Sequence, residues 1–302
     1  MSNDLFATVL DCAGRPLRLD RARVVGILNV TPDSFSDGGK HASVEAAVAH
    51  GLRMAEEGAD MIDVGGESTR PGAAEVSVEE ELRRVLPVIE QLTARTTLPI
   101  AIDTSKPEVM RAAVSAGAGM INDVYALRRD GAMEAVAQLG VPVCLMHMQG
   151  EPRSMQADPH YDDVVGEVHR FLTDRLFACE LAGIDRRKVL VDVGFGFGKT
   201  LEHNLALLCA LERFSNLGSG VFAGLSRKAM IGTLTGRTEP ADRAAGSAAA
   251  ALIAVQRGAR MVRVHDVAAT VDTLAVWRAV HAVDAVPQRI EKSTMPRWPD
   301  DD

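Results

Sequence analysis

One unit recurs along most of this chain: a short apolar run, then a polar or glycine-containing loop, then a stretch with apolar residues at helical spacing. The runs are rich in Val, Ile, Leu and Met, as expected of strands that are buried on both faces. The unit occurs eight times. The eight predicted strands are 24–30, 61–64, 100–102, 120–121, 141–146, 189–193, 221–225 and 261–264.

The segments between these runs carry helix signals. From Val78 to Leu92 apolar residues recur three and four positions apart, and Ser77 followed by Glu80 predicts a capping box. Eight strands alternating with helices fit a closed (β/α)8 barrel better than an open doubly wound sheet, which has about five to seven strands and a dinucleotide fingerprint. No linker interrupts the repeat, so we expect one α/β domain, a TIM barrel, over residues 1–284.

The two ends of the chain are predicted to lie outside the repeat. Short apolar alternation flanks a turn at Gly14-Arg15-Pro16, which predicts a hairpin within residues 1–23 that caps one barrel end. Residues 285–302 contain three prolines and end in three aspartates, so we expect a polar, disordered tail.

Composition excludes several classes of protein. A net charge of -8 argues against nonspecific nucleic-acid binding, although an acidic protein can still hold a local cationic pocket. No apolar stretch is long enough to span a membrane, and no basic and apolar leader begins the chain, so we expect a cytoplasmic protein. The four cysteines form no CxxC pair, which argues against a disulfide framework or a zinc site. They are Cys12, Cys144, Cys179 and Cys209.

Polar residues gather directly after each predicted strand. TIM barrels place their active sites at the carboxyl ends of the strands, so these residues should converge on one rim. A single polar strand end is often only a helix cap, but eight in succession indicate a shared site. The residues are Asn29; Glu67, Ser68, Thr69 and Arg70; Asp103, Thr104 and Ser105; Asn122 and Asp123; His147; Asp192; Ser226, Arg227 and Lys228; and Arg263, His265 and Asp266.

Two constellations on this rim have distinct chemistry. The first constellation contains cations and neutral hydrogen-bond donors, which are suited to binding a phosphate or pyrophosphate group. The Asn29 oxygen together with phosphate oxygens would suit Mg²⁺. For Arg263 and His265 the alternative is a strand-end salt bridge with Asp266. This anion group comprises Asn29, Thr69, Arg70, Lys228, Arg263 and His265.

The second constellation is a set of acceptors, Asp103, Asn122 and Asp192. A flat heterocycle with an amino group and a ring N–H would satisfy a buried carboxylate through two hydrogen bonds, and Lys228 could meet its acceptor-rich edge. An internal ion pair between an aspartate and Lys228 is the alternative.

Two loops are ambiguous on local pattern alone. Residues 29–39 include one large apolar group, Phe35, and form either an Asx/Pro turn ended by glycines or a ligand-binding loop. The run GFGFGKT at 194–200 misses the P-loop because Val193 occupies its first glycine position, and it also misses the dinucleotide fingerprint. It predicts a flexible strand-to-helix loop with a phenylalanine that can stack on an aromatic ligand.

Eight segments, in this order and spacing, resemble the dihydropteroate synthases of the folate pathway: ILNVTPDSFSDGG, DVGGESTRPGA, IDTSKPEVM, INDV, VCLMHMQG, VGFGFGK, LSRKAMIG and RVHDV. The resemblance covers roughly residues 24–280. It implies a homodimeric (β/α)8 barrel that condenses p-aminobenzoate with 6-hydroxymethyl-7,8-dihydropterin pyrophosphate, with Mg²⁺ assistance. It also implies dissociative loss of pyrophosphate and makes the chain an expected sulfonamide target.

Matching motifs assign roles to individual residues. The resemblance implies that Asp103, Asn122, Met146, Asp192, Phe197 and Lys228 hold the pterin; that Asn29, Thr69, Arg70, Arg263 and His265 hold pyrophosphate, with Asn29 on the metal; and that Phe35, Thr69, Pro71, Ser226 and Arg227 border p-aminobenzoate. Implied catalytic residues are Asn29, Arg70, Asp103, Lys228, Arg263 and His265. The chain departs from the family pattern at Val193, where proline is usual.

Two other interpretations stay open on sequence. A corrinoid-type pterin-binding methyltransferase would share the barrel but would not need the anion loops NVTPDSFSDGG and STRPG. A noncatalytic pterin-binding paralogue should have lost rim residues, and none of those named is missing.

Overall fold

The structure is a computed structural model that describes residues 8–31, 40–68, 75–151 and 155–284. Its centre is a closed barrel of eight parallel strands that follow chain order around the ring. The predicted (β/α)8 barrel is confirmed, and each predicted strand is present within two residues of its expected bounds. The strands are β3 (Arg23–Asn29), β4 (Met61–Gly65), β5 (Ile100–Asp103), β6 (Met120–Asp123), β7 (Val143–Met146), β8 (Val189–Asp192), β9 (Val221–Ala223) and β10 (Ala259–Val264).

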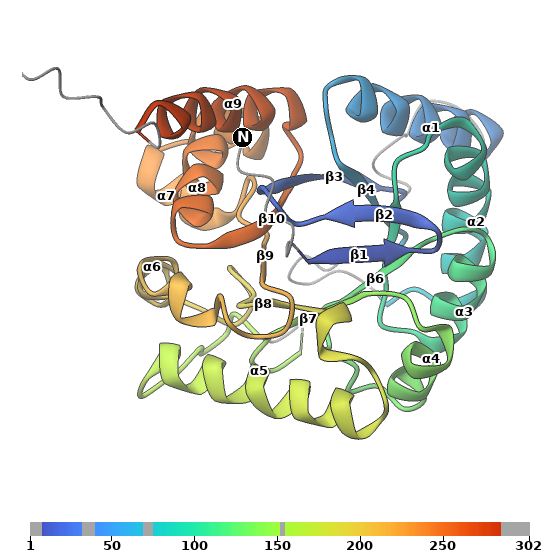
Figure 1. Ribbon diagram of the computed structural model, residues 1–302, viewed down its shortest axis with the longest axis horizontal. Coiled ribbons are helices and arrows are strands. Elements are labelled where there is room, and N and C mark those ends of the chain that lie inside the picture. Colours follow the sequence, from blue (N-terminus) through green and yellow to red (C-terminus); the bar gives the residue numbers. More distant parts are fainter. Residues whose placement is uncertain (1–7, 32–39, 69–74, 152–154, 285–302) are drawn as a thin grey trace, which may run out of the picture.

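Helices surround the barrel as an outer ring (Figure 1). They are α1 (Lys40–Glu56), α2 (Val78–Arg95), α3 (Pro107–Ser115), α4 (Ala132–Leu139), α5 (Val164–Leu181), α6 (Leu201–Cys209), α7 (Ala229–Thr235), α8 (Ala244–Gln256) and α9 (Val267–Asp284). Within the described residues the connections also contain the short 3-10 helices η2 (Arg186–Lys188), η3 (Leu211–Phe214) and η4 (Pro240–Arg243).

Helix α2 shows how far a local motif determines an element. Ser77 is its N-cap, as predicted, and the Ser77 side chain accepts a hydrogen bond from the backbone N–H of Glu80 at 3.2 Å. The reciprocal half of the predicted capping box is wrong. The Glu80 carboxylate is instead paired with Arg83 and, at 2.8 Å, with Arg84, because ion pairs one turn along the helix compete for it.

The strands bury both faces. Successive side chains of a strand point to opposite faces, so each strand contributes alternately to the barrel interior and to the layer beneath the helices. Near the amino ends of the strands the interior is apolar and takes one side chain from every strand. These are Val25, Met61, Ala101, Met120, Cys144, Leu190, Phe222 and Met261.

A hairpin lies in the described part of residues 1–23, and it covers the amino end of the barrel (Figure 1). It consists of β1 (Val9–Cys12) and β2 (Arg15–Arg18), joined at Ala13-Gly14. The turn lies earlier than predicted because positive φ is found at Ala13 and Gly14, the geometry of a tight hairpin loop, while Arg15 and Pro16 belong to the strand. Leu10, Cys12, Leu17 and Leu19 pack on the interior layer.

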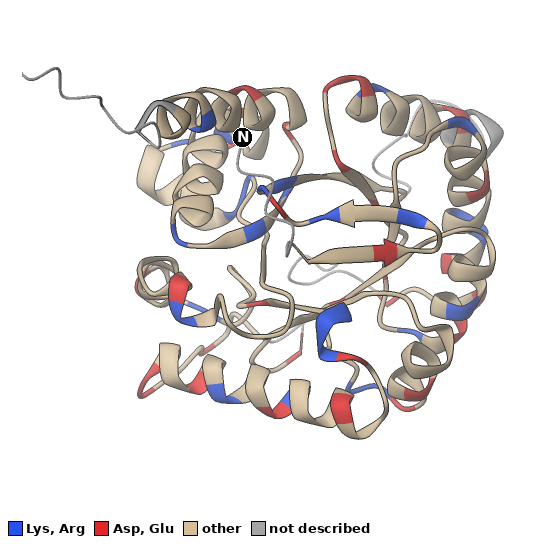
Figure 2. Ribbon diagram, in the orientation of Figure 1, with Lys and Arg blue, Asp and Glu red and all other residues tan. Residues whose placement is uncertain are grey.

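Charged residues of both signs are interspersed around the ring of helices (Figure 2). Within the described ranges no helix is both long and apolar enough to cross a membrane. Residues 1–7 and 285–302, for which we predict the start of the hairpin cap and a polar tail, lie outside the described residues.

Candidate active site

The polar rim follows from strand alternation. Positions two residues beyond the apolar interior layer face the same side, one layer closer to the carboxyl ends. Five of these eight positions are polar. Strand register sets several of them at equal height, since Asp103 pairs with both Gly65 and Asn122, and Asp192 pairs with Met146. The five polar residues are Asp63, Asp103, Asn122, Asp192 and Arg263.

Arg263 is the centre of one buried cluster. Its Nε donates to Asp63 Oδ2 at 2.5 Å and its Nη2 donates to Asp103 Oδ2 at 2.7 Å. Asn122 donates from Nδ2 to the same oxygen of Asp63 at 3.1 Å. Burial raises the pKa of Asp103 to about 7, although the nearby Arg263 charge lowers it and the charge of Asp63 adds to the increase. The residues expected at the pterin and anion sites therefore share one network.

Asp63 was missed by the reasoning from sequence. It is fully buried, and its Oδ1 has no hydrogen-bond partner among the described residues. A carboxylate within an apolar strand run, between Ile62 and Val64, was a usable signal, because a buried charge is costly unless it is paired.

Asp192 and Lys228 lie on the other side of the barrel mouth. Asp192 Oδ1 accepts the backbone N–H of Gly194 at 2.7 Å, and burial raises the pKa of this carboxyl to about 6. Burial lowers the pKa of Lys228 to about 8. The ion pairs found in the described residues do not include Asp192 with Lys228, so the alternative of an internal aspartate–lysine bridge is not supported.

Apolar side chains line the mouth beside this pair. Met146 and Phe197 are buried in a small cluster with Met148, Met155 and Val124. Lys228 Nζ lies 4.0 Å from the centroid of the Phe197 ring, within the range of a cation–π contact. The two residues expected to pack on the pterin are thus brought to the same side of the barrel as Asp192 and Lys228.

The loop after β9 and the end of β10 form a third group. Arg227 makes a two-point ion pair with Asp266, with atoms 2.5 and 3.0 Å apart, so Asp266 is not the partner of Arg263 or His265. Ser226 Oγ is 3.0 Å from His265 Nδ1 and accepts the His265 backbone N–H at 3.1 Å. The backbone of Arg227 has a positive φ of 59°, a strained conformation that is often retained at functional sites.

His265 is not a cation, although the sequence analysis placed it in the anion-binding group. Burial, reinforced by the charges of Arg263 and Arg227, lowers its pKa to about 3. Its imidazole is therefore neutral near pH 7. It can donate a neutral hydrogen bond but adds no charge, so Arg263 rather than His265 is the cationic side chain at the carboxyl end of β10.

Asn29 ends β3 and faces Gly65 in strand register. A Cβ built on Gly65 would lie 3.7 Å from Asn29 Oδ1 and 3.8 Å from Asp103 Oδ2, so the glycine keeps an opening between the two oxygens. Mg²⁺ prefers oxygen ligands and needs few from the protein when phosphates supply the rest. The Asn29 side-chain oxygen is a donor of this kind, and no cluster of three or more His, Cys, Asp or Glu ligands occurs in the described ranges.

Four predicted site residues cannot be placed. Phe35, Thr69, Arg70 and Pro71 lie outside the described residues. Two described residues that flank this range are joined directly, because Glu67 accepts the Val76 backbone N–H at 3.0 Å. Lys106 Nζ lies 2.5 Å from carboxylate oxygens of both Glu67 and Glu81. A buried lysine thus joins Glu67, which follows β4, to Glu81 of α2.

Known proteins resemble the chain over this whole region. The family model described as pterin binding enzyme matches residues 25–265. Dihydropteroate synthase of Escherichia coli (strain K12) is 53% identical over 266 residues, covering 88% of this chain and 94% of that protein.

Solved structures agree with this result. A structure of Xanthomonas albilineans dihydropteroate synthase with 4-aminobenzoic acid is 67% identical, with a TM-score of 0.88, covering 91% of this chain and 99% of the other. One of the Yersinia pestis enzyme in a sulfonamide drug complex is 48% identical, with a TM-score of 0.86 and the same coverage of both chains.

Proposed function

This chain belongs to the dihydropteroate synthases, pterin-binding transferases of folate biosynthesis, and we propose that the polar barrel mouth is its active site. The reaction joins p-aminobenzoate to 6-hydroxymethyl-7,8-dihydropterin pyrophosphate. A bond forms between the amine nitrogen and the pterin methylene carbon, the carbon–oxygen bond breaks, and pyrophosphate leaves with its electrons. The amine then loses a proton, which gives 7,8-dihydropteroate. The observation that carries the proposal is the network at one rim in which Arg263 binds Asp103 directly and Asn122 through Asp63.

The pterin occupies the side of the mouth formed by β5 to β8. Asp192 has one oxygen engaged by Gly194, and its other oxygen lies 3.8 Å from the position that a Cβ on Gly224 would take; this second oxygen is the one proposed to accept from the pterin amino group or ring N–H. Lys228 donates to the acceptor edge of the ring. Asn122 and Asp103 complete the polar contacts, while Met146 and Phe197 pack on the ring faces.

Pyrophosphate lies toward β3 and β10. Arg263 uses Nε and Nη2 for its two aspartates, which leaves Nη1 to donate to a phosphate oxygen. Asn29 offers an oxygen to Mg²⁺, and neutral His265 donates one hydrogen bond. When bound, Mg²⁺ would neutralise charge that develops on the departing pyrophosphate. Thr69 and Arg70 are proposed to complete this site.

The chain's own residues stabilise separated charges rather than form a covalent intermediate. As the carbon–oxygen bond lengthens, the pterin delocalises positive charge, and the carboxylates of Asp103 and Asp192 lie where they can stabilise it. Arg263 holds the leaving group in place. Ser226 and Arg227 then orient p-aminobenzoate, together with Phe35, Thr69 and Pro71, so that its amine meets the methylene carbon.

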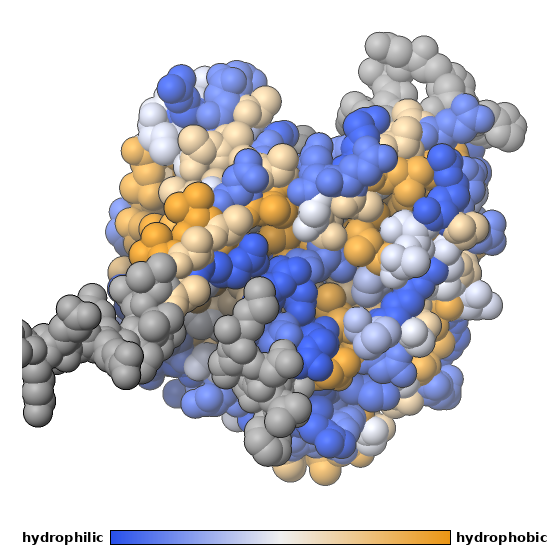
Figure 3. Space-filling view, turned by 45° about the horizontal axis from the view of Figure 1, so that its top comes forward, coloured by the Kyte–Doolittle hydropathy of each residue, from blue (hydrophilic) through white to orange (hydrophobic). Residues whose placement is uncertain are grey.

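A homodimer and a cytoplasmic location belong to the same proposal. Helices α8 and α9 pack on each other, and their surroundings carry exposed apolar side chains, seen as an apolar area on that side of the molecule in Figure 3. The side chains are Leu234, Ile253, Val276 and Val280. Sedimentation at micromolar concentration should show a dimer, and a monomer would refute this part of the proposal.

The activity itself is tested by pyrophosphate release. We expect release that requires both the pterin pyrophosphate and p-aminobenzoate, with 7,8-dihydropteroate formed in equal amount. Asp192→Asn should weaken binding of 6-hydroxymethylpterin in calorimetry. Binding of the pterin without any pyrophosphate release would favour the noncatalytic paralogue, and methyl transfer from a methylated folate would favour the methyltransferase.

A further inference from the structure

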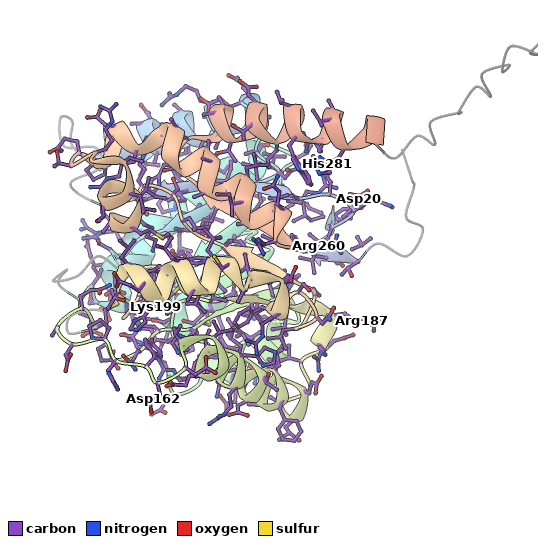
Figure 4. All side chains as sticks on the ribbon, turned by 90° about the vertical axis from the view of Figure 1, so that its left-hand side faces the viewer. Asp20, Asp162, Arg187, Lys199, Arg260 and His281 are labelled. Carbon is purple, nitrogen blue, oxygen red and sulfur yellow. The ribbon has the colours of Figure 1, made fainter. Side chains whose placement is uncertain are left out.

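The run GFGFGKT ends in a lysine for which neither the reaction nor the resemblance provides a role. Lys199 is buried, with 3% of its surface exposed, and lies at the carboxyl end of the barrel, opposite the end where Asp20, Arg187 and Arg260 are found (Figure 4). A buried lysine is rare unless its ammonium is fully hydrogen-bonded. The surroundings of this ammonium therefore indicate its function.

Four acceptors surround Lys199 Nζ. It lies 2.9 Å from the carbonyl oxygen of Phe197, 3.0 Å from that of Gly194 and 3.4 Å from that of His147. The fourth acceptor is His147 Nδ1 at 3.0 Å. One lysine thus bridges the loop after β7, which contains His147, and the loop after β8, which contains Gly194 and Phe197.

The tautomer of His147 is fixed by this contact. Burial, followed by the charge of Lys199, lowers the pKa of His147 to about 2, so the ring is neutral. While Lys199 is protonated its ammonium can only donate, so in that state Nδ1 of the ring must accept and Nε2 must carry the proton. The ring is held edge-on to Phe171, with centroids 4.9 Å apart, which leaves it little freedom to turn away from Lys199.

The two loops meet backbone to backbone. Gly194 has a positive φ of 69°, and a Cβ at this position would lie 1.8 Å from the carbonyl oxygen of His147. Such a close junction brings several carbonyl oxygens together, and in a buried position each needs a donor. Lys199 supplies donors to carbonyl oxygens of both loops.

The residues proposed to bind the pterin come directly from these loops. Met146 precedes His147, Asp192 precedes the glycine run, and Phe197 belongs to it. The His147 backbone N–H also donates to the Asp192 carbonyl oxygen at 2.9 Å. Displacement of the loop after β8 would therefore move Phe197 away from Lys228 and alter the direction of the Asp192 carboxylate.

We propose that Lys199 is a positioning residue for the pterin site, whose ammonium joins the loops after β7 and β8 so that Asp192, Met146 and Phe197 face the pterin. The proposal rests on the assignment of the pterin site above. It assigns no contact between Lys199 and the substrate. Burial lowers the pKa of Lys199 to about 7, and the three carbonyl oxygens and the imidazole are the groups that solvate the ammonium in place of water.

Lys199→Met tests the charge, because methionine fills much of the same space without a donor. Calorimetry with 6-hydroxymethylpterin should show a Kd at least about tenfold higher than that of the wild-type protein, about 1.4 kcal/mol. At saturating pterin pyrophosphate the KM for p-aminobenzoate should change less than about twofold, because Ser226 and Arg227 belong to another loop. The matched control is Lys188→Met, since Lys188 also donates to a carbonyl, that of Gly140 at 2.6 Å, but before β8 at the opposite barrel end.

Lys199→Ala, tested with added small molecules, distinguishes the effect of the lysine charge from the effect of its packing. It also takes the place of the methionine variant if that variant shows no cooperative thermal transition. Propylammonium has the atoms that alanine lacks, so its chloride salt should restore pterin affinity, whereas 1-propanol and sodium chloride should not. Equal rescue by 1-propanol, or an unchanged Kd in both variants, would overturn the proposal. Asp192→Asn runs alongside: if it also leaves the Kd unchanged, the pterin site itself is misplaced, and if only the Lys199 variants do, the positioning role alone fails.

Discussion

Replacement of Asp192 by asparagine should weaken pterin binding in a way that depends on pH. Asparagine keeps the size of the side chain and can still accept the Gly194 N–H with its amide oxygen. It cannot offer a charged acceptor to the ligand. A hydrogen bond to a charged group contributes about 1.5–3 kcal/mol, and 1.4 kcal/mol is a factor of about ten, so the Kd for 6-hydroxymethylpterin should rise about 10- to 150-fold at pH 7.

Protonation supplies an internal check on this magnitude. Burial raises the pKa of Asp192 to about 6, so at pH 7 the carboxylate form dominates and at pH 5 only about a tenth of the wild-type protein has it. Since apparent affinity scales with the competent fraction, the wild-type Kd should rise about tenfold over this range from Asp192 alone. The asparagine variant lacks this titration. The ratio of the two Kd values should therefore shrink about tenfold between pH 7 and pH 5, and titration of Asp103 cancels in the ratio.

Asp123→Asn is the matched control. Burial raises the pKa of Asp123 to about 6 as well, but its oxygens accept the backbone N–H groups of Tyr125 and Leu127 at 2.9 and 2.7 Å. This variant should unfold at a lower temperature and keep the wild-type pH dependence of pterin binding. An Asp192→Asn Kd within about twofold of wild type at pH 7, or a ratio that is the same at both pH values, would refute the reasoning.

Three further outcomes are expected. Asp63→Asn removes the negative charge that helps to raise the pKa of Asp103, so the acid limb of the kcat/KM pH profile should move to lower pH. An acid limb at the wild-type pH would show that the charge of Asp63 does not act on the titrating group. Gly119→Ala should lower the free energy of unfolding by about 1–3 kcal/mol, measured by urea titration, because its Cβ would lie 2.3 Å from a hairpin carbonyl oxygen. Between pH 7.5 and 8.5 the melting temperature should rise, because Lys199 and Lys228 have lowered pKa values and release protons in the folded state while the unfolded chain keeps them; the double methionine variant should lose this rise.

Periodicity was sufficient to predict the barrel, because a parallel strand buried on both faces must be apolar and short, and each such run was visible. Alternation along the strands also brought Asp103, Asn122, Asp192 and Arg263 to one rim, as strand-end chemistry predicts. The local sequence pattern could not predict which side chain each of these charged or polar groups contacts. The neutral state of His265 depends on Arg263 and Arg227, which are near in space, and the pairing of Asp266 with Arg227 crosses between adjacent strand ends.

Asp63 and Lys199 illustrate two different limits. Asp63 lies inside a strand, where only knowledge of the closed barrel shows that its side chain meets Arg263 from the far end of the sequence. In the sequence, Lys199 is one lysine in a glycine-rich loop and nothing marks it as buried. Its role depends on backbone carbonyl oxygens around its ammonium, and no side-chain motif predicts where these lie. Backbone acceptors are present at every residue, so sequence alone gives no sign of where they converge.

The hairpin over the amino end of the barrel has a consequence for synthesis on the ribosome. Its apolar residues pack against Met261 of the last barrel strand as well as Val25 of the first, and Arg260 donates to the Leu19 carbonyl oxygen at 3.4 Å across a separation of 241 residues. A nascent chain therefore has no finished binding surface for its first strands until β10 has emerged. We expect this hairpin, which is translated before the barrel strands, to be among the last elements to gain protection from amide exchange, so that a chaperone holding it would delay closure of the whole ring.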